Sequence, residues 1–214
     1  MKNNLSQEFI RFALSQNILQ FGEFTLKSGR VSPYFFNAGL FYTAEQLSRL
    51  GQFYAQTLSD SQLEFDILFG PAYKGLPLAT TTAVALHSQE KNISVSFNRK
   101  EAKQHGEGGQ LIGAPLKGKR VVIIDDVITA GTAYREAKQQ INEAGGQLVG
   151  LIIALNRQEI GLNNQSAIKE IEEQDKIPVL SVITLDDITA YLREENKQAE
   201  VEKISAYQNQ YGTS

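Results

Sequence analysis

The sequence predicts an α/β fold in which a central, mostly parallel sheet is flanked by helices. From residue 65 onward, short apolar runs alternate with stretches of helical periodicity, which is the order expected of parallel strands joined by crossover helices. The run Val121–Ile124 is apolar at every position, as in a strand buried on both faces. A length of 214 residues suits one domain with a buried core.

The N-terminal part is predicted to form two helices around a hairpin. Apolar residues recur at helical spacing near residues 6–20 and predict the first helix. The turn-rich segment 24–37 has short extended runs interrupted by glycine and proline, which indicates a small hairpin. Thr43 and Gln46 match a capping box, so a second helix is expected to begin there.

Strands and helices then alternate to the end of the chain. Apolar runs, helical periodicity and the pair Gly145-Gly146 set the boundaries. The expected strands are 65–69, 93–97, 121–124, 148–155 and 179–183, and the expected helices are 76–86, 132–144, 185–195 and 198–210.

Composition excludes several classes of protein. Apolar residues make up 42% and charged residues 21%, which is ordinary for a globular domain and argues against disorder. A net charge of −3 gives no global attraction for nucleic acid or an anionic membrane. The absence of cysteine excludes disulfides and thiolate chemistry and suits a reducing compartment. The N-terminus is polar and has no apolar core of a signal peptide, and no apolar stretch is long enough to span a membrane. We therefore expect a cytoplasmic protein without nucleic-acid or membrane partners.

The strongest local signal is the segment 121–133, which reads as a buried strand, two acids, a small-residue loop and a helix. Ligands of open α/β sheets bind at the carboxyl ends of strands, where Asp125 and Asp126 are expected. Gly131 lets the backbone approach a ligand, and the helix that follows offers unpaired N–H groups to a phosphate. The segment therefore predicts a phosphate cradle whose acids hold ribose hydroxyls or a sugar-bound metal. A strand followed by an ordinary capped helix is the alternative.

A second pair of acids, Asp186 and Asp187, lacks this context. Thr184 and Asp187 match a capping box, and no glycine follows them. We interpret this pair as helix capping.

A basic stretch at residues 97–109 suggests a lid. Arg99, Lys100, Lys103 and His105 lie close together and are followed by three glycines. A solvated surface loop is the alternative, but clustered cations on a glycine-rich loop also suit a departing pyrophosphate, on which charge accumulates in the transition state. Beside a sugar-phosphate cradle, we favour the lid.

The turn 69–75 directly follows a predicted strand and adds another candidate for binding pyrophosphate. Gly70 and Gly75 permit close backbone approach, and Lys74 supplies a positive charge. An ordinary turn with an exposed lysine is the alternative.

Two other nucleotide or metal signals are rejected. Residues 113–119 match the start of a P-loop, but Arg120 replaces the required Ser or Thr and the segment precedes a strand, so we expect a surface turn. With only two histidines, the chain gives little support for a histidine-based metal site.

The segment 121–133 resembles the phosphoribosyl pyrophosphate motif of type I phosphoribosyltransferases, in which the acids hold the ribose 2- and 3-hydroxyls and the loop holds the 5-phosphate. Segments 24–37, 70–75, 98–103 and 156–159 are similar to those of bacterial orotate phosphoribosyltransferases, and together the matches extend over most of the chain. The resemblance implies the type I phosphoribosyltransferase fold. It also implies a single domain, 1–214, with a small N-terminal hood of about residues 1–40 packed on the core.

The same resemblance implies roles for individual residues. Donor contacts are implied for Lys27, Tyr73, Lys74, Arg99, Lys100, Lys103, His105, Asp125, Asp126, Val127, Ile128, Thr129, Ala130, Gly131, Thr132 and Ala133. Orotate contacts are implied for Phe35, Phe36, Thr129 and Arg157, and catalytic roles for Lys103, His105, Asp125 and Asp126. Magnesium is expected to be held mainly through the substrate, near the two acids, with no metal ligated directly by side chains. The family forms homodimers with shared sites, so Lys100, Lys103 and His105 would act in the neighbouring subunit.

The implied reaction moves ribose 5-phosphate from phosphoribosyl pyrophosphate to N1 of orotate, giving orotidine 5-phosphate and pyrophosphate in de novo pyrimidine biosynthesis. Arg157 fits this acceptor, because a guanidinium can bind the orotate carboxylate with a forked pair of hydrogen bonds. A phosphoribosyltransferase for another base, or a non-catalytic regulator that senses the donor, are the alternatives. The acidic balance, the lack of an appended nucleic-acid-binding module and the presence of the lid argue against the regulator.

Overall fold

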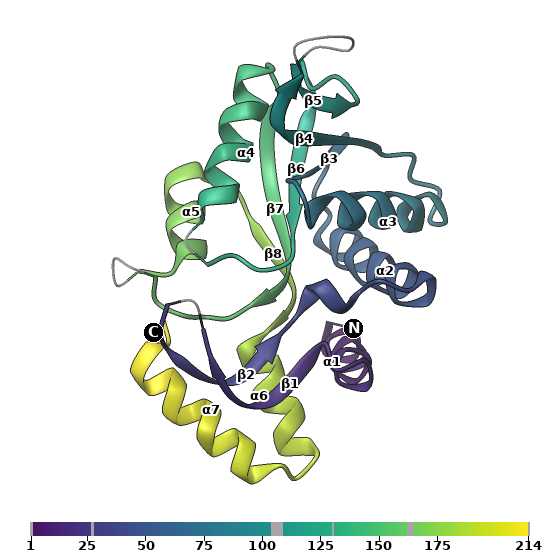
Figure 1. Cartoon of the computed structure of the whole chain (residues 1–214). Helices are drawn as coiled ribbons and strands as arrows, with labels where there is room; N and C mark the ends of the chain where they lie inside the picture. The colour runs from purple at the N-terminus through teal and green to yellow at the C-terminus, as the bar shows by residue number, and fades with distance from the viewer. Residues whose placement is uncertain (1, 27, 104–108, 130, 162–164, 214) are drawn as a thin grey trace.

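The computed structural model describes residues 2–26, 28–103, 109–129, 131–161 and 165–213. A six-stranded sheet forms the centre and has the order β5-β4-β3-β6-β7-β8, with β5 antiparallel to β4 and all other neighbours parallel (Figure 1). Its strands are β3 (Ile67–Gly70), β4 (Ser94–Lys103), β5 (Gly109–Gly113), β6 (Arg120–Asp125), β7 (Gln147–Asn156) and β8 (Val179–Thr184). The α/β fold with a mostly parallel sheet is confirmed.

Helices cover both faces of the sheet, and a separate hairpin lies beside it (Figure 1). The hairpin consists of β1 (Leu19–Thr25) and β2 (Val31–Phe36), followed by the short 3-10 helix η1 (Ala38–Leu40). The α-helices are α1 (Lys2–Ser15), α2 (Ala44–Ser61), α3 (Gly75–His87), α4 (Thr132–Glu143), α5 (Ala167–Asp175), α6 (Leu185–Glu194) and α7 (Gln198–Tyr211).

The central strand β6 divides two hydrophobic cores. Val122 and Ile124 pack in the larger core, with α1, α2, α3, the hairpin, α6 and α7. Val121 and Ile123 point to the opposite face and pack in the smaller core with α4 and α5. All four side chains are at most 1% exposed, as the uninterrupted apolar run predicts for a strand buried on both sides.

Several local predictions are confirmed by hydrogen bonds. The Thr43 hydroxyl accepts from the backbone N–H of Gln46, which closes the predicted capping box of α2. Thr184 and Asp187 form the second predicted capping box, at the start of α6. Asp187 is thus a capping residue, as predicted, whereas the side chain of Asp186 accepts from Nε2 of Gln158 at 2.7 Å.

Three predictions differ from the structure. The first helix ends at Ser15, because the backbone turns at Asn17 with a φ of 56° and the next apolar residues enter β1. The basic stretch is part of a hairpin, since β4 continues to Lys103 and β5 begins at Gly109. Helix α5 was not predicted. The side chain of Ser166 caps this helix by accepting N–H groups of its first turn.

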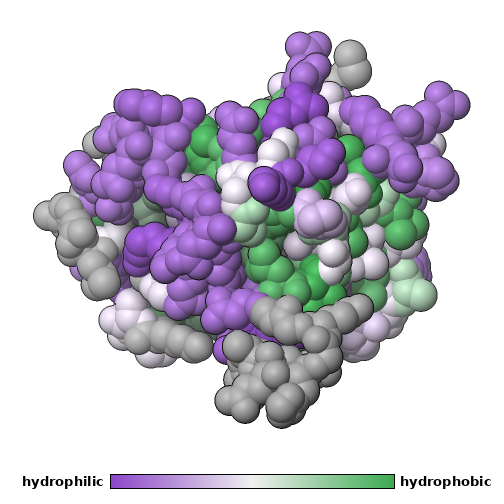
Figure 2. Space-filling view, turned by 90° about the horizontal axis from the view of Figure 1, so that it is seen from above, coloured by the Kyte–Doolittle hydropathy of each residue, from purple (hydrophilic) through white to green (hydrophobic). Residues whose placement is uncertain are grey.

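Some apolar side chains remain uncovered at the surface. Among the described residues, Val31, Tyr42, Tyr73, Val84 and Ile112 are large, apolar and exposed. The face seen from above in Figure 2 has apolar residues gathered near its centre and polar residues around them. In the described ranges, no helix combines the length and apolar character needed to cross a membrane.

Candidate active site

The segments that carry the predicted chemistry meet at one edge of the sheet. Strands β3, β6 and β7 are neighbours and run parallel, so their carboxyl ends lie side by side. The turn 71–74, the loop 126–131 and the segment 157–160 follow these three strands in turn. Three motifs far apart in the sequence therefore converge, as expected for a ligand site of an open α/β sheet.

Asp125 and Asp126 are held firmly at the end of β6. The Tyr54 hydroxyl donates to the carbonyl of Asp125 at 2.8 Å, and the N–H of Ala154 donates to the carbonyl of Asp126 at 2.9 Å. The Asp126 side chain is 11% exposed and lies 2.5 Å from Nζ of Lys74. The structure thus joins the acid pair to the lysine of the preceding turn, two motifs that the sequence suggested separately.

The carboxyl group of Asp125 is electrostatically different from a free carboxylate. Burial, and secondarily the charge of Asp126, raise the pKa of Asp125 from 3.8 to about 7. Asp125 therefore carries a proton during much of the time near neutral pH, and it can both donate and accept hydrogen bonds. Such a group suits the recognition of ribose hydroxyls, which also donate and accept.

The predicted phosphate cradle has an open helix end. Gly131 is the N-cap of α4 with a φ of 70°, a backbone conformation that favours glycine, and no side chain caps the helix. By contrast, threonine hydroxyls accept N–H groups at the starts of α2 and α6. The first turn of α4 carries Thr132 and Ala133, both exposed, and the unpaired N–H groups of such a helix start suit an anion. The alternative of an ordinary capped helix is thereby contradicted.

The other cradle residues complete the loop. Thr129 is exposed, while Val127 and Ile128 are half-buried against the two cores. Ala130 lies outside the described residues, as do Lys27 and His105. For Lys103, the structure describes the backbone at the end of β4 but not the side chain.

The turn after β3 folds tightly on itself. A Cβ atom at Gly70 would lie 2.2 Å from the carbonyl oxygen of Gly75, so the close approach that the glycines permit is between the two ends of the turn. The N–H of Ala72 donates to Oδ1 of Asn98 at 2.6 Å, which ties the turn to β4. Asn98 was not among the residues predicted for the site.

The described part of the basic stretch is next to this turn. Lys100 on β4 places Nζ 4.9 Å from the ring centre of Tyr73, a side chain that is 70% exposed. Lys74, Lys100 and the acid pair therefore border the same region. Arg99 precedes Lys100 on the same strand.

Arg157 directly follows β7, and its side chain is largely shielded from solvent. Its side chain is 11% exposed, its Nε donates to Oε1 of Glu159 at 2.9 Å, and its guanidinium lies 4.6 Å from the ring centre of Tyr34. Burial opposes its charge, but Tyr34 and Glu159 raise the pKa of Arg157 above its ordinary value. A buried cation with such partners is well suited to receive an anionic ligand.

The segment 157–160 is clamped by residues from both ends of the chain. The N–H of Ile160 donates to the carbonyl of Tyr211 at 2.8 Å. The N–H of Thr213 donates to the carbonyl of Gln158, also at 2.8 Å. Nη1 of Arg30, in the hairpin, donates to the carbonyl of Ile160 at 3.1 Å. The hairpin and the end of α7 thus fix the backbone that carries Arg157.

The structure places the rings of Phe35 and Phe36 on opposite faces of β2. Phe36 is buried in the larger core, where its ring centre is 6.3 Å from that of Phe9. Phe35 is half-buried and stacks on Phe24 at 5.4 Å. Consecutive side chains of a strand alternate between faces, so the two rings do not line one space together.

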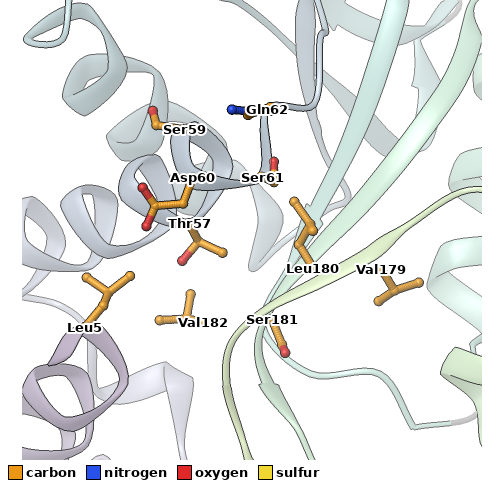
Figure 3. Close-up of a pocket in the computed structure, with 10 residues that line it drawn as sticks. All are labelled: Leu5, Thr57, Ser59, Asp60, Ser61, Gln62, Val179, Leu180, Ser181 and Val182. Atoms are coloured by element: carbon orange, nitrogen blue, oxygen red, sulfur yellow. The ribbon is translucent and has the colours of Figure 1, made fainter. Parts of the chain in front are cut away.

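A cavity of about 630 Å³ lies away from this edge (Figure 3). Its walls come from α1, the last turn of α2 and β8 and comprise Leu5, Thr57, Ser59, Asp60, Ser61, Gln62, Val179, Leu180, Ser181 and Val182. Since Val179 is the first residue of β8, the cavity lies beside the start of a strand, whereas ligands of such sheets bind beyond the carboxyl ends. It is not part of the candidate site.

Comparison with known proteins agrees with this geometry. Residues 41–201 match the phosphoribosyl transferase domain family. The chain is 58% identical over 210 residues to an orotate phosphoribosyltransferase of Legionella pneumophila, covering 98% of this chain and 99% of that one, and 57% identical over 211 residues to one of Pseudomonas aeruginosa, covering 96% and 97%. The crystal structure of the orotate phosphoribosyltransferase of Francisella tularensis superposes with a TM-score of 0.88 at 42% identity, covering 96% of this chain and 100% of that one. The chain therefore belongs to the orotate phosphoribosyltransferases, within the family of the phosphoribosyl transferase domain.

Proposed function

We propose that the protein transfers ribose 5-phosphate from phosphoribosyl pyrophosphate to N1 of orotate, giving orotidine 5-phosphate and pyrophosphate for de novo synthesis of UMP. The observation that carries the proposal is the convergence of two half-sites at one sheet edge. The open end of α4 with Asp125 and Asp126 suits a ribose phosphate, and the buried guanidinium of Arg157 suits a carboxylate. Orotate has a carboxylate that other nucleobases lack, which favours it over another base.

The described residues suggest how the donor is held and activated. The α4 cradle binds the 5-phosphate, and Asp125 and Asp126 bind the ribose hydroxyls. Lys74, Arg99 and Lys100 stabilise negative charge on the departing pyrophosphate. Lys27, Tyr73 and Thr129 add donor contacts, and Lys103 and His105 stabilise or protonate the leaving group. Positioning and electrostatics supply most of the rate enhancement.

The transfer itself needs no covalent enzyme intermediate. The bond between C1 of ribose and the pyrophosphate oxygen loosens toward an oxocarbenium-like state, and its electron pair leaves with pyrophosphate. Orotate N1 attacks C1 from the opposite face and forms the new bond. Arg157 holds the orotate carboxylate, Thr129 contacts the same ring, and Phe35 and Phe36 contribute from β2, Phe36 through its main chain because its side chain is in the core.

The residues at this edge fit a magnesium ion that arrives with the donor. Mg²⁺ is usually held by one or two carboxylates together with substrate phosphates, and Asp125 and Asp126 provide such a pair. Among the described residues, no group of three or more potential ligands offers a cage made by the protein alone. When bound, the ion would neutralise charge on the pyrophosphate.

We also propose that the protein acts as a homodimer with shared active sites. Helix α3 is apolar on nearly all sides, and Val84 on its outer face is 66% exposed, whereas helices of this composition are normally covered. A second copy packed on α3 would cover this face and bring Lys100, Lys103 and His105 to the neighbouring site. Sedimentation equilibrium should give twice the chain mass of 23.7 kDa, and Val84→Glu should shift it toward one chain mass. A wild-type protein that sediments as a single chain would exclude this assembly.

A spectroscopic assay tests the function directly. The purified protein is mixed with orotate, Mg²⁺ and phosphoribosyl pyrophosphate, and the ultraviolet absorbance of orotate is followed. We expect orotate to be consumed only when the donor is present, and uracil, which lacks the carboxylate, to remain. Donor binding without loss of orotate would reject this acceptor.

The proposed cytoplasmic location agrees with a cysteine-free chain, and cell fractionation tests it.

A further inference from the structure

Glu159 has no role in the site as described so far, yet it lies directly behind Arg157. Oε1 of Glu159 accepts from Nε of Arg157 at 2.9 Å, and Nη2 of the same guanidinium is 2.7 Å from that oxygen. Both side chains are buried, with exposed fractions of 11% for Arg157 and 14% for Glu159. Removing both charges from water costs free energy that their attraction does not always repay, so we expect the pair to serve a purpose other than stability.

The contacts of Arg157 leave one end of its guanidinium open. Nε and Nη2 face Glu159, and Nη2 also donates to Oγ of Ser32 at 3.4 Å. The flat face lies on the Tyr34 ring. Tyr207 also faces the pair: burial raises the pKa of its hydroxyl, Glu159 raises it further and Arg157 lowers it, but no hydrogen bond within normal geometric limits joins them. Within the described parts of the chain, no hydrogen bond of normal geometry takes up the two N–H groups of Nη1. The guanidinium is therefore fixed along one edge and one face, with the Nη1 end remaining for a ligand.

Glu159 is itself anchored from two other parts of the fold. The Tyr34 hydroxyl donates to Oε1 at 3.1 Å, and burial raises the pKa of Tyr34 well above its ordinary value, so this hydroxyl keeps its proton. Arg30 lies 3.8 Å from the other oxygen, Oε2. The backbone of Glu159 forms an isolated β-bridge with Gly212. A carboxylate held in this way can define the orientation of its partner.

We propose that Glu159 is a positioning residue for orotate: it sets the plane of the Arg157 guanidinium so that the Nη1 end meets the substrate carboxylate. The inference rests on the proposed function, since it assumes that Arg157 receives orotate. Its role is geometric. The charge of Glu159 works against binding of an anion, so removing that charge alone does not weaken the orotate complex.

The hydrogen bonds of Glu159 provide a way to separate geometry from charge. Each hydrogen bond that this side chain accepts from the described residues goes to Oε1, so Glu159→Gln can keep these bonds through its single amide oxygen. Glu159→Asp keeps the charge but withdraws the oxygens by one carbon–carbon bond. Because displacement of a binding group by about 1 Å can cost on the order of 100-fold, the shorter acid should be the worse substitute.

The test is steady-state kinetics of these two variants with each substrate varied in turn. For Glu159→Asp we expect the KM for orotate to rise about tenfold or more, while the KM for phosphoribosyl pyrophosphate stays within about twofold. For Glu159→Gln we expect the KM for orotate to stay within about threefold of wild type. Glu64→Asp is the matched control, because Glu64 pairs with Arg120 at 2.6 Å beside the starts of the strands, remote from the site.

Each other outcome overturns the inference. If Glu159→Asp has the wild-type KM for orotate, Glu159 does not position Arg157. If the KM for orotate rises more in Glu159→Gln than in Glu159→Asp, the charge of Glu159 is responsible and not its geometry. Equal rises for both substrates in Glu159→Asp indicate a general distortion. If Glu159→Asp does not fold, Tyr34→Phe replaces it: this variant keeps the ring and removes one anchor of Oε1, and an unchanged KM for orotate would then reject the proposal. Wild-type protein that does not consume orotate would instead refute the proposed function.

Discussion

At pH 8, the Asp125→Asn variant is expected to be more stable than wild type and at least about a thousandfold less active. The folded protein holds the pKa of Asp125 at about 7, whereas the ordinary value is 3.8. Folding therefore favours the neutral carboxyl, and this contribution to stability is fully present below pH 4 and lost as the pH rises through 7. Asparagine has no charge to lose, so the variant should have a higher free energy of unfolding than wild type at pH 8.

Thermal unfolding at several pH values checks this prediction. The difference between Asp125→Asn and wild type should be close to zero near pH 4, grow as the pH rises and level off above pH 7. Asp60→Asn is the control, because Asp60 is an exposed acid near the end of α2 and its replacement should show no such trend. A stability difference of the same size at pH 4 and pH 8 would mean that the charge of Asp125 is not its source. The loss of activity follows because asparagine replaces one carboxylate oxygen by an NH2 group and cannot carry the negative charge that Asp125 has at pH 8, so it binds the ribose hydroxyls less well.

Arg157→Lys should lower kcat/KM for orotate by about two orders of magnitude and leave the KM for phosphoribosyl pyrophosphate nearly unchanged. Lysine keeps the positive charge but cannot bind Glu159 along one edge while it presents other N–H groups to the substrate carboxylate, and its ammonium group cannot lie flat on Tyr34 as the guanidinium does. The preference for orotate over uracil should therefore become smaller, because the guanidinium that contacts the orotate carboxylate is gone.

Kinetics with orotate and with uracil measure this change in preference. Arg120→Lys is a matched control, because Arg120 also binds carboxylates but lies at the first residue of β6, away from the site. If Arg157→Lys retained wild-type kcat/KM for orotate, the acceptor carboxylate would have to bind elsewhere. A parallel rise in the KM for both substrates would indicate damage to the fold.

Features encoded by neighbouring residues were predictable from the sequence. The two capping boxes, the buried strand β6 and the open start of α4 each depend on a few consecutive residues whose chemistry is visible in the chain. The cradle could be predicted for the same reason, because its acids, its glycine and the helix that follows are contiguous. To predict that Lys74 lies near Asp126, only one further rule is required: ligands bind at the carboxyl ends of parallel strands, so the residues that follow neighbouring strands come together.

Features made by distant residues were not predictable in this way. Tyr34 and Glu159 are 125 positions apart, and no periodicity or spacing connects them. Asn98 supports the turn at Ala72 through a side chain whose direction depends on the register of β4 with β3. The end of α1 was placed too late because Ile18 and Leu19 are apolar in either reading, and only the tertiary fold shows that they continue into a strand. Such contacts depend on the complete packing of the domain.

The clamp on residues 157–160 affects the order in which the protein matures. The contact between Gln158 and Thr213 spans 55 positions, and the contact between Arg30 and Ile160 spans 130. Of the residues that hold this segment, Arg30 is made before Arg157, whereas Tyr211 and Thr213 are made after it. A nascent chain can assemble the surface that grips the sugar phosphate while the pocket for the base is still loose. The support of the segment that carries Arg157 is thus complete only after the residues near Thr213 have been made.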